Sequence, residues 1–123
     1  MKRKPEMYVV RSLLFIFDID YPCDEARESF IVSKNVNDEK ELTELFDEFM
    51  KGEFLIYTSP EREWCIETLR YFLDLDDDFD EVFSRITTYF DDDVIEPKKF
   101  MKTLLDCLIR YHVESSTSEV HDG

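Results

Sequence analysis

The chain has 123 residues, a formal net charge of −15 at pH 7, and 43% hydrophobic residues. This length allows one hydrophobic core, and eleven phenylalanines and six tyrosines exclude a disordered chain. The negative charge argues against binding to nucleic acid or to an anionic membrane, because both need a basic protein surface. It suits a basic protein partner instead.

The cysteines and the N-terminus indicate the compartment. Cys23, Cys65 and Cys107 are widely spaced and form no CxxC motif. This usage predicts free thiols in a reducing compartment, the cytoplasm or the nucleus. The first residues are basic, but Arg11 and Asp18 interrupt the apolar run behind them, so we expect neither a signal peptide nor a membrane span.

The first predicted element is a strand over residues 8–18. The segment 13–22 is a continuous apolar run that ends in Asp18 and Asp20, which is typical of a buried strand in a parallel sheet. Both carboxylates then point the same way at the carboxyl end of the strand. Such a pair suits a divalent cation or an aspartyl nucleophile. Alternatively, the strand only ends in a turn, where Asp and Pro are common.

Helix and strand signals alternate after this run. Residues 23–36 are ambiguous, with weak helical character. A helix is predicted over 38–50, with Asp38 as its N-cap and Gly52 just beyond its end. A second short apolar strand over 53–59 follows.

The second half of the chain repeats the alternation. A helix begins at Ser59, the expected capping residue, and ends near the acidic run 74–80. Residues 81–90 have strong β composition and predict a third strand, and a last amphipathic helix starts at Pro97. Residues 109–113 could be the end of that helix or a final short strand, and residues 115–123 are polar and are predicted to be disordered.

The predicted order β-α-β-α-β-α indicates an α/β fold, a small Rossmann-like three-layer sandwich with a short parallel sheet. Residues 1–113 form one domain in this prediction, and 114–123 form a polar C-terminal tail. Adjacent strands would place Asp18 near the hydroxyls of Thr58 and Ser59, beside a helix N-terminus that attracts phosphate. Alternatively, Ser59 is only a helix cap, which fully explains a serine at that position.

This order of motifs resembles the haloacid dehalogenase (HAD) superfamily, and most closely its RNA polymerase C-terminal-domain phosphatase-like group. The resemblance rests on the strand that ends in Asp18-Ile19-Asp20, the later strand that ends in Thr58, and lysines in a later helix. It implies a HAD-like core with a minimal cap. The implied activity is Mg²⁺-dependent hydrolysis of a phosphomonoester, on a small molecule or a phosphoprotein, through an aspartyl-phosphate.

The resemblance implies roles for the carboxylates. Asp18 would be the nucleophile, Asp20 the general acid and base, and both would bind Mg²⁺. The sequence departs from the family at Pro22, where the family has Thr or Val. It also lacks the later acidic pair that completes the metal site, and Glu114 is the sole candidate for that role.

The resemblance also implies the phosphate-binding side chains. Thr58, or Ser59, would donate a hydrogen bond to a phosphoryl oxygen. Lys102, or Lys98 in the alternative register, would neutralise the phosphate. Exposed lysines on an amphipathic helix are otherwise routine.

Three functions remain open from the sequence. The first is a small Mg²⁺-dependent phosphatase, and the second is a catalytically weakened member of the same fold that binds proteins. The third is an acidic, all-helical interaction protein in which Leu13–Phe17 is part of a buried helix.

Overall fold

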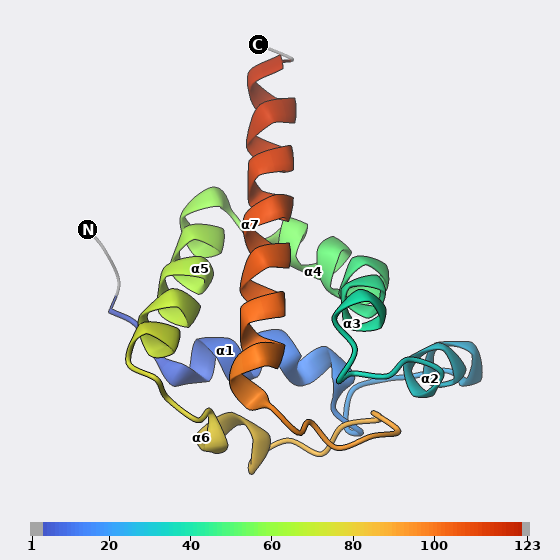
Figure 1. Ribbon diagram of the computed structural model, residues 1–123. Coiled ribbons are helices and arrows are strands. Elements are labelled where there is room, and N and C mark those ends of the chain that lie inside the picture. The colour runs from blue at the N-terminus through green and yellow to red at the C-terminus, as the bar shows by residue number, and fades with distance from the viewer. Residues whose placement is uncertain (1–3, 122–123) are drawn as a thin grey trace.

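The C-terminal helix α7 (Pro97–His121) runs through the middle of the fold, as the computed structural model shows (Figure 1). Helix α5 (Ser59–Asp74) lies on one side of α7, and α3 (Glu39–Leu45) and α4 (Lys51–Ile56) lie on the other. The structure describes residues 4–121, with side chains through residue 115. The remaining elements are α1 (Met7–Leu14), the 3₁₀-helix η1 (Phe15–Phe17), α2 (Glu25–Val32), the π-helix η2 (Phe46–Met50) and α6 (Asp80–Phe83).

Residues 4–121 contain helices and one isolated antiparallel bridge, between Asp18 and Thr88, but no strand. The predicted α/β sandwich is therefore wrong, and so is the HAD-like, Rossmann-like core. The chain is a small all-helical domain. The segment Leu13–Phe17 is helical and, apart from the exposed Phe15, buried, in agreement with the third interpretation of the sequence.

The first predicted strand is helical because its apolar residues also recur at helical spacing. The side chains that recur every three or four residues are buried: Met7, Val10, Leu14 and Phe17. The exposed positions Tyr8, Ser12 and Phe15 share the opposite face. A continuous apolar run does not distinguish a buried strand from a buried helix.

The second predicted strand is helical because the preceding helix does not end at Gly52. Helix α3, η2 and α4 follow one another without a break as far as Ile56. A glycine inside a helix costs about 1 kcal/mol. Burial of the Phe54 side chain, which is 0% exposed, contributes about 1.5–3 kcal/mol and outweighs that cost.

The third predicted strand is also absent. Only residues 80–83 are regular, as the short helix α6, and residues 84–96 form a loop, here called the α6–α7 loop. The predicted N-cap Asp38 of α3 and the start of α7 at Pro97 are confirmed. Helix α7 continues to His121, so residues 114–121 of the expected tail are helical.

The core lies where α7 packs against the other helices, and Tyr111 is its largest fully buried side chain. The π-helix η2 places Asp47 beside α7. One Asp47 carboxylate oxygen accepts hydrogen bonds from the Tyr111 hydroxyl (2.5 Å) and from the Arg110 guanidinium (2.6 Å). Burial and the Asp47 carboxylate raise the pKa of Tyr111 well above its usual value. None of the described helices is long and apolar enough to cross a membrane.

Candidate protein-binding surface

Asp18, the predicted nucleophile, is a buried hydrogen-bond acceptor within a turn. It follows η1 and is 6% exposed. One carboxylate oxygen accepts from the backbone N–H of Asp20 (2.8 Å), and the other accepts from the backbone N–H of Thr87 (3.1 Å). The Asp20 side chain is exposed. The Asp18 carboxylate therefore joins the turn after η1 to the α6–α7 loop.

Thr58, rather than Ser59, caps α5. The Thr58 hydroxyl accepts from the backbone N–H of Glu61 (3.3 Å), and the Glu61 carboxylate accepts from the backbone N–H of Thr58 (2.8 Å). This is a capping box, which stabilises the first turn of a helix. Ser59 is the first residue of α5. The predicted capping role of Ser59 therefore belongs to its neighbour.

The other predicted site residues lie on α7. The Lys98 ammonium is 2.5 Å from the Asp76 carboxylate, and Lys102 is exposed. The Glu114 carboxylate is 3.4 Å from the Lys51 ammonium. Each ion pair is largely exposed, and such pairs contribute little to stability.

The structure does not bring the predicted phosphatase site together. The N-terminal end of α5, where Thr58 lies, is at the opposite end of the bundle from the segment after η1 that holds Asp18 (Figure 1). Among the described residues, no group of three or more His, Cys, Asp or Glu side chains is arranged to hold a metal ion. The predicted Mg²⁺ ligands Asp18 and Glu114 have the separate partners given above.

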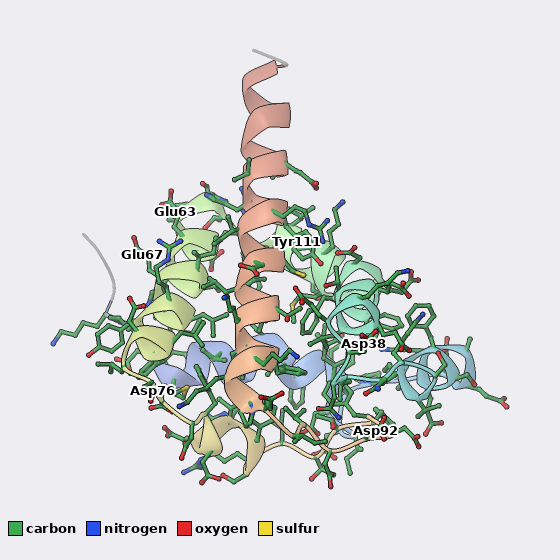
Figure 2. The ribbon with its side chains drawn as sticks, in the orientation of Figure 1. Asp38, Glu63, Glu67, Asp76, Asp92 and Tyr111 are labelled. Atoms are coloured by element: carbon green, nitrogen blue, oxygen red, sulfur yellow. The ribbon has the colours of Figure 1, made fainter. Side chains whose placement is uncertain are left out.

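Negative charge is concentrated in residues 74–96, which contain ten acidic residues and one basic residue, Arg85. The acidic residues are Asp74, Asp76, Asp77, Asp78, Asp80, Glu81, Asp91, Asp92, Asp93 and Glu96. Asp76 and Asp92 both lie in the lower half of the molecule, Asp76 on the left near the end of α5 and Asp92 on the right (Figure 2). Lys98 offsets part of this charge through Asp76, whereas Asp91, Asp92 and Asp93 are exposed.

The α6–α7 loop has no helix or strand of its own, but backbone hydrogen bonds fix its middle. The backbone N–H of Ile19 donates to the Thr87 carbonyl (2.8 Å), and the backbone N–H of Tyr89 donates to the Phe17 carbonyl (3.0 Å). These two bonds flank the Asp18–Thr88 bridge. The Tyr89 hydroxyl also donates to the Ile19 carbonyl (3.1 Å).

Asn37 fixes the other end of this loop. Its side-chain amide nitrogen donates to the Asp93 carbonyl (2.8 Å), and its amide oxygen accepts from the backbone N–H of Ile95 (2.9 Å). The Asn37 side chain thus satisfies backbone groups of Asp93 and Ile95 that have no partner in a helix or strand. Asn37 precedes a helix cap in the sequence, and no local pattern connects it to a loop more than fifty residues later.

A groove of about 360 Å³ lies along the α6–α7 loop. Its apolar lining consists of Phe83, Ile86, Phe90, Val94 and Pro97. Its polar lining consists of Thr87, Thr88, Asp92 and Asp93. The Phe90 ring packs against the rings of Phe17 and Phe100, whose centres are 5.4 Å and 5.9 Å from its own. The α6–α7 groove is therefore apolar on part of its wall and acidic on another.

Comparison with protein-family models, with curated proteins and with solved structures gave no match for this chain. The structure alone therefore defines the class of protein. It is an acidic domain whose described residues lie in helices or loops.

Proposed function

We propose that this protein is a non-catalytic helical module that binds a basic segment of another protein in the α6–α7 groove. The observation that carries the proposal is the combination of an apolar wall with exposed Asp92 and Asp93 on one fixed loop. The second and third interpretations of the sequence both included a protein-binding role.

The lining chemistry favours arginine or lysine side chains that alternate with apolar residues. The methylene stem of a cationic side chain packs on apolar surface while its charged head stays near water or a carboxylate. Phe83 and Phe90 supply such a surface, and the acidic segment supplies the carboxylates. The field of a strongly negative protein also accelerates encounter with a cationic partner, and added salt screens this effect.

The loop restraints support the same proposal. Ordering a flexible loop on binding costs free energy, so a loop already fixed in the free protein binds more tightly. Asp18, Asn37 and Tyr89 hold the α6–α7 loop at separate points along its length. In this proposal, Asp18 strengthens peptide binding indirectly, because its hydrogen bond to Thr87 fixes the position of the groove wall.

A peptide-binding experiment tests the proposal. A fluorescent synthetic peptide of alternating arginine and leucine is titrated with the full chain, and binding is followed by anisotropy. The double variant Asp92→Asn/Asp93→Asn should weaken binding about tenfold, which corresponds to about 1.4 kcal/mol. Increasing the NaCl concentration should weaken binding further.

The matched control carries the same charge change at a distant site. Glu63 and Glu67 lie on α5, far from Asp92 (Figure 2), and the Glu63 carboxylate is 3.8 Å from the His112 imidazole of α7. The variant Glu63→Gln/Glu67→Gln should change peptide affinity less than about threefold, because the bulk of the field remains. Equal losses in the two double variants would show that net charge alone attracts the peptide, and would refute a specific groove.

A further inference from the structure

Residues 86–90 of the α6–α7 loop are paired with another segment along one edge only. The Thr87 carbonyl accepts from the backbone N–H of Ile19 (2.8 Å), and the backbone N–H of Tyr89 donates to the Phe17 carbonyl (3.0 Å). The bonded groups belong to alternate residues, as in an antiparallel pair of strands. This edge of the segment is therefore already occupied.

The other edge of the segment is open. The backbone N–H and carbonyl of Thr88, which lies between the two bonded residues, point away from the paired edge. Among the described residues, none donates to the Thr88 carbonyl or accepts from its N–H. The backbone groups of Ile86 and Phe90 likewise have no hydrogen-bond partner in the described part of the chain. An unpaired edge of this kind is a template for one more strand.

The open edge belongs to the α6–α7 groove. Ile86, Thr88 and Phe90 all line the groove. Alternate side chains share one face of an extended segment, so Ile86 and Phe90 place apolar surface on the same face. The exposed Asp92 and Asp93 line the same groove. Unpaired backbone groups, apolar side chains and carboxylates are thus combined in one site.

The opposite face of the segment is negatively charged. Tyr89 lies on that face, and its partial burial raises the pKa of its hydroxyl. The pKa is raised further by the nearby Cys23, Glu28, Asp18 and Asp20. A cationic side chain beside Tyr89 would therefore lie near carboxylates.

We propose that the basic partner binds as an extended strand that pairs with residues 86–90. The pairing rests on the proposed function, because it concerns the same partner in the same groove. The Thr88 N–H donates to a carbonyl of the partner, and the Thr88 carbonyl accepts from an N–H of the partner. Leucines of the partner lie beside Ile86 and Phe90, and the alternation places its arginines on the face of Tyr89. Main-chain bonds then provide affinity, and the alternating side chains provide specificity.

Two peptides of equal composition distinguish a bound strand from a bound helix. One alternates arginine and leucine, and the other has its leucines at every third or fourth position, the spacing of an apolar helix face. We expect the full chain to bind the alternating peptide about tenfold more tightly by anisotropy. Equal or tighter binding of the second peptide would overturn the strand pairing and keep the proposed function. Failure of both peptides to bind would refute the proposed function as well.

Thr88 offers a matched pair of variants. Thr88→Pro removes an N–H that has no described partner, and proline is tolerated where an edge N–H faces outward. Thr88→Val keeps the N–H and the branched shape of the side chain. With both variants folded by circular dichroism, Thr88→Val should bind the alternating peptide about 3- to 10-fold more tightly than Thr88→Pro. Equal affinities of the two folded variants would overturn the pairing.

Amide hydrogen exchange tests the pairing without a substitution. In the free chain, the Tyr89 amide is bonded to Phe17, whereas the Thr88 amide has no described partner. Saturation with the alternating peptide should slow Thr88 exchange by about tenfold or more and change Tyr89 exchange much less. Unchanged Thr88 exchange in a chain that binds the peptide would overturn the pairing and leave the proposed function intact.

Discussion

Replacing Asp18 separates its role in this structure from the catalytic role predicted from the sequence. As a nucleophile, Asp18 could be changed to Asn with loss of activity and little loss of stability. In this structure, its carboxylate accepts backbone hydrogen bonds from Asp20 (2.8 Å) and Thr87 (3.1 Å). Substitution should therefore destabilise the fold and release the α6–α7 loop.

The size of the effect follows from these two bonds. A hydrogen bond to a charged group contributes about 1.5–3 kcal/mol. Asp20 and Thr87 are exposed, so water replaces part of the loss in a variant. We expect Asp18→Ala to lower the free energy of unfolding by about 2–3 kcal/mol. Asp18→Asn keeps one acceptor oxygen, and we expect a loss of about 1–1.5 kcal/mol.

Urea denaturation followed by circular dichroism measures these changes, and amide hydrogen exchange reports on the loop. The Thr87 amide should exchange faster in Asp18→Ala. Asp20→Asn is the control, because its exposed side chain makes no described hydrogen bond, and it should stay within about 0.5 kcal/mol of the parent. If Asp18→Ala were as stable as Asp20→Asn, with unchanged Thr87 exchange, the anchoring role would be refuted.

Three further predictions concern stability. Thr58→Ala removes the capping box of α5 and should cost about 1 kcal/mol in urea melts, whereas an equal cost for Ser59→Ala would contradict the assignment of the cap. Tyr111→Phe removes a donor to Asp47 and should cost about 1–2 kcal/mol by calorimetry, and an unchanged melting temperature would argue against that bond. The pKa of Cys65 is raised from 9.0 to about 12, so the unfolded chain loses this proton first and stability should fall as pH rises from 9 to 12. Cys65→Val should reduce this fall, and an identical pH profile would contradict it.

The helices that carry their own boundary signals could be predicted from the sequence. Asp38 caps α3 and Pro97 starts α7, and in both cases the signal and the structure coincide. The apolar runs could not be assigned in the same way. The apolar runs in residues 8–18 and 53–59 are short enough to form either a strand or a turn of helix. Which of the two forms depends on tertiary packing, in which Phe17 and Phe54 are buried.

The candidate binding surface could not be predicted from the sequence in the same way. The acidic runs 74–80 and 91–93 are visible in the sequence, but there they were interpreted as solvated loops. What makes the α6–α7 groove is a set of contacts between distant segments, such as Asn37 with Asp93 and Asp18 with Thr87. Neither pair has a spacing signal, because a loop anchor depends on tertiary position alone. Strong β composition in 81–90 instead predicted a strand, where the chain forms only one bridge, at Thr88.

The most direct test of the proposed binding function is an NMR titration of the isotope-labelled full chain with the arginine–leucine peptide. We expect backbone shift changes to concentrate in residues 83–97 and at their anchors, Asp18 and Asn37, and to diminish strongly in the Asp92→Asn/Asp93→Asn variant. Shift changes spread evenly over the acidic residues of α2, α3 and α5, and unaltered by that variant, would contradict a defined binding groove.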